Sequence, residues 1–210
     1  MRISHLPKAL VLSALLLPAA LPGVLTAAEA PSGALAVDAQ SFRCIREMTP
    51  VRHFYVDNVL GNLPATLAAA NAPGGAVYPP GSVIQLVPTE AMVKREAGFS
   101  PATGDWEFFE LEVDGKQTAI RARGFAEVKN RFGGDCFACH APARQPWDFV
   151  WEDSHGCEAI PVSRQMTGAL QRTDPRCGES ELQSGDRWAL FKLQALVWIG
   201  TTKAAIGRIF

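Results

Sequence analysis

The chain has 210 residues, 48% of them hydrophobic, and its 20 basic residues nearly balance 21 acidic ones, giving a net charge of −1. That balance excludes the clustered basic face that nucleic-acid binding requires, so we expect no nucleic-acid partner. The length is enough for one domain with its own hydrophobic core, and the sequence has no internal repeat or low-complexity tract.

Residues 1–28 have the pattern of a secretory signal peptide. Arg2 and Lys8 are followed by the apolar stretch Ala9–Leu21, and small residues near Ala28 offer a cleavage site. The stretch is short and interrupted by proline, unlike a membrane span. Removal of this segment leaves a net charge of −3. We therefore predict a periplasmic protein.

The chain after the signal predicts a lead-in and then alternating strands and helices. Residues 29–41 are small and polar, which is typical of a poorly ordered segment, and we assign residues 29–45 to a lead-in before the domain. Strand and helix-start signals then predict, in chain order, a strand over Val51–Val56, a helix over Leu63–Ala70, a loop over Asn71–Gly81, a strand over Ser82–Val87 and a helical turn over Ala91–Arg95.

The clearest β signal is a hairpin around Asp114-Gly115, a turn dipeptide. Strands are predicted on either side, over Trp106–Val113 and Thr118–Phe125. Charged and apolar residues alternate in both, which indicates one solvated and one covered face. The charged residues are Glu107, Glu110, Glu112, Arg121 and Arg123. Pairs between them across the strands would be exposed and contribute little. The sequence thus predicts a β-rich α+β fold, mainly an antiparallel sheet with a few helices.

Cys136-Phe137-Ala138-Cys139-His140 has the Cys-x-x-Cys-His spacing of c-type haem attachment. Two thiols at this spacing form thioether bonds to the haem vinyl groups, and the imidazole becomes an axial iron ligand. We predict one covalent haem c held by Cys136, Cys139 and His140, loaded outside the cytoplasm by the haem-attachment machinery. The second ring nitrogen of His140 should donate to a carbonyl or carboxylate, and Asp148 is a candidate.

Two alternatives to haem remain open for this motif. A thioredoxin-like redox pair is expected near a βαβ pattern, which the sequence does not show. A zinc site needs two further ligands at short spacing, and Cys157 and Cys177 form no second Cys-x-x-Cys.

Three cysteines are left once two attach the haem: Cys44, Cys157 and Cys177. In an oxidising compartment we expect one disulfide and one odd thiol. Cys157 and Cys177 enclose a short proline-containing loop and are the favoured pair, while pairing of Cys44 with either one stays open.

Three segments share their spacing with a known family. Tyr78–Val83 matches an aromatic-x-x-Gly-Thr/Ser-Val strand entry, Asp105–Phe109 a Trp-plus-aromatic strand, and Cys136–His140 with Asp148–Val150 a haem segment with a trailing Asp-x-Val. Together they resemble the cytochrome P-460 and cytochrome c′-beta family, over roughly residues 50–152. The resemblance implies a β-rich haem domain, with the single haem in its C-terminal part, and a homodimer.

Leu86 departs from the hydroxylamine-oxidising members of this family. Those members carry a lysine that crosslinks to the haem five positions after the strand-entry glycine, which is Gly81 here. Leucine cannot form this bond, and Lys94 would need a register shift to replace it. The resemblance therefore implies the uncrosslinked branch, which binds small gases such as nitric oxide or passes single electrons. Hydroxylamine oxidation is the alternative, and we expect no enzyme activity as the first interpretation.

The second axial position of the iron is open from the sequence. Residues able by type to fill it are Met48, Met92, Met166, His53 and His155. By resemblance we expect no protein ligand there and an apolar, aromatic distal wall. The nearest candidates for that wall are Trp106, Phe108 and Phe109, although aromatic residues on a strand are more often ordinary core.

The domain predicted over residues 46–177 is followed by a tail, residues 178–210. Gly178–Asp186 reads as a linker and Trp188–Ile199 as an apolar helix. Docking of this helix on the domain or on a dimer partner is the first interpretation. Peripheral membrane contact is the second, because tryptophan and basic residues suit an interface. A true span is the least favoured, since charges interrupt the apolar run. The expected functional partner is a small gas or a redox protein.

Overall fold

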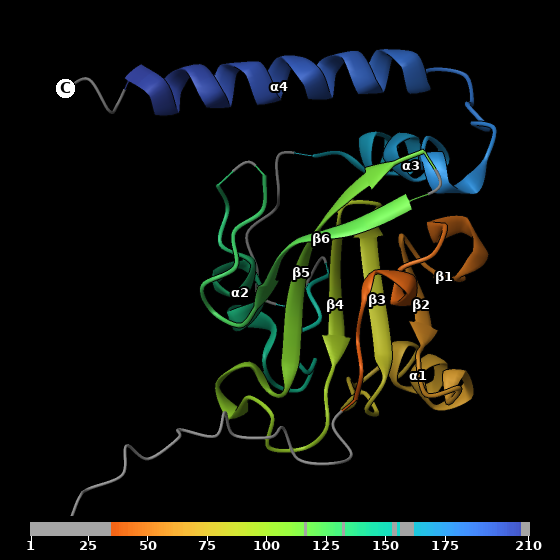
Figure 1. The fold of residues 1–210 in the computed structure, drawn as a ribbon, viewed down its shortest axis with the longest axis vertical. Coiled ribbons are helices and arrows are strands. Elements are labelled where there is room, and N and C mark those ends of the chain that lie inside the picture. The colour runs from red at the N-terminus through yellow and green to blue at the C-terminus, as the bar shows by residue number, and fades with distance from the viewer. Residues whose placement is uncertain (1–34, 116, 132, 153–154, 156–161, 207–210) are drawn as a thin grey trace, which may run out of the picture. The chain divides into compact units, whose positions relative to one another are not determined.

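The computed structural model describes residues 35–115, 117–131, 133–152, 155 and 162–206. The chain divides into Met1–Gly33 and Ala34–Phe210, and the expected signal peptide lies outside the described residues. The described part has a six-stranded antiparallel sheet and four α-helices (Figure 1). The predicted α+β class is confirmed at this level.

Each strand of the sheet pairs with its neighbour in the sequence, which makes the sheet an antiparallel meander (Figure 1). The strands are β1 (Thr49–Val51), β2 (Phe54–Asn58), β3 (Ser82–Val87), β4 (Glu90–Lys94), β5 (Trp106–Asp114) and β6 (Gln117–Gly124). The helices are α1 (Leu63–Ala70), α2 (Cys136–His140), α3 (Arg164–Arg172) and α4 (Asp186–Ile206).

Several predicted elements are confirmed, and two are wrong. The helix α1, the strand β3 and the β5–β6 hairpin lie where the sequence predicted them. The predicted strand Val51–Val56 is divided by a turn at Arg52, whose φ of 52° lies in the left-handed region. The predicted helical turn Ala91–Arg95 is wrong, because β4 pairs with β3 and β5 and its central residues are buried. Tertiary pairing overrides a weak local preference there.

The sheet carries a separate apolar cluster on each face. On one face, here called the α2 face, Val56, Ile84, Met92 and Phe108 form a row across four strands, and Cys136 packs against their cluster. The opposite face holds the second cluster, with Phe42, Ile45, Met48, Phe109 and Leu111. Phe42 is only 2% exposed. The lead-in predicted as poorly ordered therefore forms part of the core from Leu35 onward.

The strand β5 is buried on both faces over Trp106–Leu111, so the predicted solvated face is wrong for these residues. Glu107 is buried against Arg95 and Arg123, with 2.6 Å between Arg123 Nε and Glu107 Oε1. Glu110 is fully buried, and Arg131 Nε lies 3.0 Å from its Oε1. Cross-strand charge pairs do form, between Glu107 and Arg123 and between Glu110 and Arg121, but their acidic members are buried rather than exposed.

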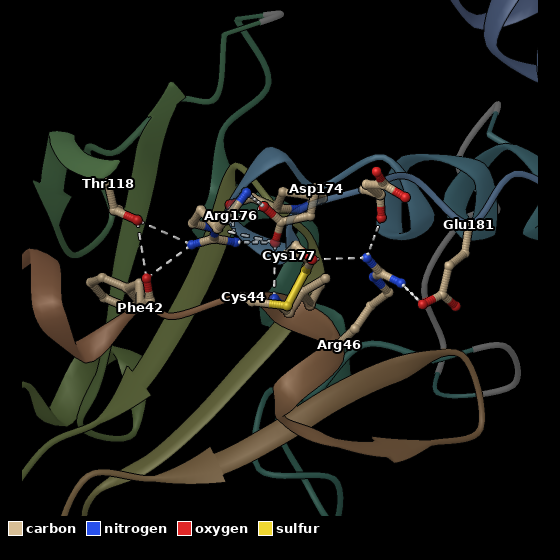
Figure 2. Close-up of a disulfide and its surroundings, with 11 residues drawn as sticks. Phe42, Cys44, Arg46, Thr118, Asp174, Arg176, Cys177 and Glu181 are labelled. Carbon is tan, nitrogen blue, oxygen red and sulfur yellow. Dashed lines mark hydrogen bonds and ion pairs between the residues drawn. A yellow bond between two sulfur atoms is a disulfide. The ribbon is translucent and has the colours of Figure 1, made fainter. Parts of the chain in front are cut away.

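A disulfide joins Cys44 to Cys177, which overturns the favoured pairing of Cys157 with Cys177 (Figure 2). The turn before Cys177 explains this choice. Arg176 is buried, forms an ion pair with Asp174 at 2.7 Å and donates to the carbonyl oxygen of Phe42 at 3.0 Å. Asp174 also accepts from the backbone N–H of Ile45 at 2.9 Å. These bonds bring Cys177 to Cys44, whereas Cys157 lies outside the described residues.

The predicted apolar helix of the tail is confirmed as part of α4, which runs past α3 and lies clear of the sheet (Figure 1). Its start is fixed by Asp186, which accepts two 2.7 Å bonds from Arg172 of α3. Beyond this point large apolar side chains are exposed, namely Trp188, Phe191, Leu196 and Trp198. Among the helices of the described residues, none combines the length and apolarity needed to cross a membrane.

Candidate functional site

The helix α2 brings Cys136, Cys139 and His140 together within one turn. Its first turn is capped by Asp135, whose carboxylate accepts from the backbone N–H of Ala138 at 2.8 Å. The spacing i, i+3, i+4 places the two thiols and the imidazole on neighbouring positions of one helix surface. The local sequence thus builds the predicted attachment geometry through a short, capped helix.

Both thiols of the motif are free and protonated at neutral pH. Cys136 is half-buried and Cys139 exposed, and no disulfide joins them. Burial raises the pKa of Cys136 to about 12, with smaller contributions from Glu90 and Glu110. Burial, followed by the charge of Asp135, also raises the pKa of Cys139. Thiol–disulfide exchange needs a thiolate of low pKa, so these surroundings disfavour the redox-pair alternative.

One ring nitrogen of His140 is already bonded inside the protein. Its Nδ1 lies 2.7 Å from the carbonyl oxygen of Phe149. A carbonyl oxygen only accepts, so Nδ1 carries the proton and Nε2 keeps its lone pair. Burial lowers the pKa of His140, which favours the neutral imidazole that an iron ligand must be. The expected bond to a carbonyl is confirmed, with Phe149 rather than Asp148 as the partner.

Asp148 instead anchors the segment that carries this carbonyl. Lys94 Nζ lies 2.8 and 2.7 Å from its two carboxylate oxygens, and the backbone N–H of Tyr78 donates to it at 2.8 Å. Trp106 Nε1 donates to the Asp148 carbonyl at 2.7 Å. Burial raises the pKa of Asp148, and the bond from Lys94 opposes this rise. Four contacts from three parts of the chain therefore fix Asp148.

The backbone at Asp148 and Phe149 adopts a conformation that side chains rarely allow. Their φ angles are 50° and 64°, both in the left-handed region. Gly104 makes this possible, because a Cβ there would lie 2.6 Å from the ring of Phe149. Lys94 also donates to the Gly104 carbonyl at 2.7 Å. Strained backbone held by several independent contacts commonly marks a functional position.

The surroundings of the motif are apolar and aromatic. The ring of His140 lies 5.2 Å from that of Phe108, and Phe137 contacts both Phe108 and Phe149. Two of the aromatic residues named as candidate wall, Trp106 and Phe108, lie in the α2-face cluster. Phe109 is in the cluster of the opposite face, which removes it from the candidate wall.

The candidates for a second axial ligand are dispersed through the fold. Met92 is the one methionine of the three that shares a cluster with Cys136, since Met48 lies on the opposite face and Met166 of α3 packs against α4. His155 stacks on Trp147 with ring centroids 3.9 Å apart, and His53 lies 4.0 Å from Glu152.

Leu86 packs on the α2-face cluster, so the position that carries the crosslinking lysine in the resembling enzymes is occupied here by an apolar side chain on the same sheet face as the motif. Lys94 is bound to Asp148 and Gly104 and is not available as a substitute.

A pair of carboxyl groups beside Cys136 was missed by the sequence analysis. Glu90 of β4 lies opposite Glu110 of β5, and both contribute to the raised pKa of Cys136. Burial, reinforced by the charge of Glu110, raises the pKa of Glu90 to about 7, against opposing contributions from Asn130 and Arg131. The alternation of charged and apolar residues along the strand had placed Glu110 on a solvated face. The two glutamates become neighbours only through the register in which β4 pairs with β5.

Comparison of the chain with family models, with curated proteins and with solved structures found no match. Among the described residues no group of three or more His, Cys, Asp or Glu side chains is arranged to hold a metal ion. The zinc alternative therefore finds no further ligands for Cys136 and Cys139 in this part of the chain.

Proposed function

We propose that this protein is a periplasmic mono-haem c-type cytochrome of the kind found in the cytochrome P-460 and cytochrome c′-beta family. The observation that carries the proposal is the single helical turn that presents two protonated thiols and a neutral imidazole with a bonded Nδ1. These residues fit a covalent haem: Cys136 and Cys139 would form the thioethers and His140 would supply the axial nitrogen. The bound haem would supply an iron able to bind small ligands and to change oxidation state.

The protein's own residues favour binding of a small uncharged gas, such as nitric oxide, or transfer of single electrons. Apolar and aromatic side chains around the motif penalise charged ligands through desolvation, whereas a neutral diatomic loses no hydrogen bonds on entry. Leu86 and the engaged Lys94 argue against a lysine–haem crosslink. Oxidation of hydroxylamine is the second candidate and is disfavoured by the same two residues.

We further propose that the protein acts as a homodimer, and that the exposed apolar side chains of α4 contribute to that contact. Trp188 and Phe191 stack at 5.2 Å and are 61% and 56% exposed. Neighbouring exposed aromatic residues are typical of interaction surfaces. A peripheral contact of α4 with a membrane surface is the alternative for the same side chains.

The deciding experiment is haem analysis of the exported protein. Denatured protein should retain haem and give the pyridine spectrum of two thioether bonds, and Cys136→Ser with Cys139→Ser should abolish it. Cys157→Ser, the matched control, should retain haem. A haem-free wild-type protein recovered from a host that attaches c-type haem contradicts the proposal.

Two measurements on the haem protein then separate the candidate functions. A change in the absorption spectrum of the reduced protein on addition of nitric oxide or carbon monoxide supports gas binding. If the spectrum does not change, electron transfer is the remaining candidate function. Turnover of hydroxylamine with an artificial electron acceptor would instead support the enzyme.

A further inference from the structure

A pocket of about 400 Å³ opens between the β1–β2 turn, the loop after α1 and four further residues, Trp147, Val150, Glu152 and His155. None of its lining residues belongs to α2, although Ala69, Ala70, Tyr78 and Val150 are members of the α2-face cluster. Its volume is within the range of sites for small organic molecules. Nothing in the proposed function uses it.

Part of the pocket wall is apolar and held at a fixed position. Ala69, Ala70 and Val150 line it as buried side chains. At Gly75 the φ angle is +78°, and a Cβ would collide with the carbonyl group of Pro146. The two loops that form the walls therefore approach each other more closely than any side chain at position 75 would permit. Such a preformed apolar surface suits the body of a small ligand.

Three hydrogen-bond donors that line the pocket have no acceptor among the described residues: the Tyr78 hydroxyl, the Trp147 indole N–H and Nη1 of Arg52. Tyr78 is 4% exposed, and burial raises its pKa, so the hydroxyl keeps its proton at any ordinary pH. These donors are open to the pocket, so a ligand oxygen there can accept from them. The three donors come from three different segments and all line one pocket.

The charges in the lining cancel. Both Nε and Nη2 of Arg52 bind the carboxylate of Glu152, and Nη2 also donates to the carbonyl of Ala70 at 2.8 Å. An anion would have to compete with Glu152 for Arg52, and a cation would have to displace Arg52 from Glu152. A neutral molecule avoids both costs.

Two aromatic rings also line the pocket: those of Trp147 and His155 stack on each other at an interplanar angle of 5°. Arg52, which faces the pocket, is held in the left-handed region at a φ of 52°. Strain of this kind persists where the surroundings fix it, commonly at ligand sites.

We propose that this pocket binds a neutral, planar ring that carries carbonyl oxygens, which is the chemistry of a small quinone. The ring would pack on the alanines and Val150, and its carbonyl oxygens would accept from Tyr78 and Trp147. The proposal concerns binding alone and does not depend on the presence of haem.

The test uses the oxidised full-length protein and duroquinone, a methylated quinone without free ring positions, with binding followed by equilibrium dialysis. Durene, which has the same ring and methyl groups but no carbonyls, is the matched ligand. Duroquinone should bind saturably and durene at least tenfold more weakly, because only the former satisfies the donors. Equal binding of the two overturns the role of the donors, and tighter binding of benzoate shows an anion site instead.

The matched variants are Tyr78→Phe and Tyr55→Phe, since Tyr55 packs on the opposite face of the sheet. Removal of one neutral hydrogen bond should weaken duroquinone binding about fivefold in Tyr78→Phe and leave Tyr55→Phe unchanged. Thermal melting checks that both variants fold. If Tyr78→Phe does not fold, Trp147→Phe removes a second donor of the pocket instead. Absence of duroquinone binding at millimolar concentration, or unchanged binding in the donor variants, overturns the proposal.

Discussion

His140 owes its position to residues far from its own motif. The carbonyl that binds its Nδ1 belongs to Phe149, and Phe149 follows Asp148, which Lys94 holds by two bonds. The buried ion pair between Lys94 and Asp148 therefore acts on the imidazole through the backbone. Lys94 is thus a positioning residue for the proposed iron ligand.

Replacing Lys94 with methionine should destabilise the fold by about 3–5 kcal/mol, because it leaves the buried Asp148 carboxylate without its cation. The pKa of Asp148, already raised by burial, would rise further, so protonation relieves the penalty. The loss should be largest at neutral pH and shrink as the pH falls through that raised pKa. Chemical denaturation of the wild type and the variant at pH 7 and pH 4 measures both effects.

Two controls accompany this variant. Lys129→Met, at an exposed position, should change stability by less than about 0.5 kcal/mol. Adding Asp148→Asn to Lys94→Met should recover much of the loss, and a double variant no more stable than the single one contradicts the ion-pair explanation.

Glu90 predicts a second pH dependence. Its pKa of about 7 in the folded protein exceeds the ordinary value of 4.5, so the folded chain keeps a proton that the unfolded chain releases. Stability should therefore fall as the pH rises from about 4.5 to about 7, by at most roughly 3 kcal/mol. Glu90→Gln should abolish this fall in denaturation midpoints measured across that range. The exposed Glu112→Gln should retain it, and a wild-type protein with no such fall would refute the assignment.

The motif residues were predictable from the sequence, and the residues that support them were not. Cys136, Cys139 and His140 are close in the chain, so their spacing alone places them together. Lys94 and Asp148 are 54 positions apart, and only the folded chain joins them. The same holds for Glu90 and Glu110, whose neighbourhood depends on the register of β4 and β5.

At the level of elements, the sequence predicted correctly those helices and strands whose conformation is determined by neighbouring residues in the chain. Asp114-Gly115 set the hairpin of β5 and β6, and Pro64 near the start of α1 set that helix. The strand β4 was missed because its short sequence favours no single conformation, and pairing on both sides decides it. The burial of Glu107 and Glu110 was missed because arginines from the following segments cover them.

The helix α4 gives a prediction about assembly. Trp188→Glu with Phe191→Glu places two charges on its exposed aromatic pair and should convert the proposed dimer to a monomer in sedimentation velocity. Gln194→Glu, an exposed polar position on the same helix, should leave the dimer intact. A wild-type monomer, or a charged variant that stays dimeric, would show that α4 is not the contact.

At the scale of the whole molecule, the disulfide closes a long loop. Cys44 and Cys177 are 133 positions apart, and bridges that close long loops restrict the unfolded chain most. Cys44→Ser with Cys177→Ser should reduce the free energy of unfolding by roughly 4 kcal/mol in denaturant titration. Cys157→Ser should have little effect, and a non-reducing peptide map that links Cys157 to Cys177 would contradict the pairing.

The same bridge determines what a single proteolytic cut does. A cut anywhere between residues 44 and 177 yields two pieces that stay covalently joined until the disulfide is reduced, so the sheet and α2 remain in one molecule. A cut after Cys177 and before Asp186 leaves α4 with no covalent link to the rest, held by its contacts with α3 alone. Of the six strands and four α-helices of the described residues, α4 is therefore the one that lies outside the loop closed by the bridge and that limited proteolysis can remove alone.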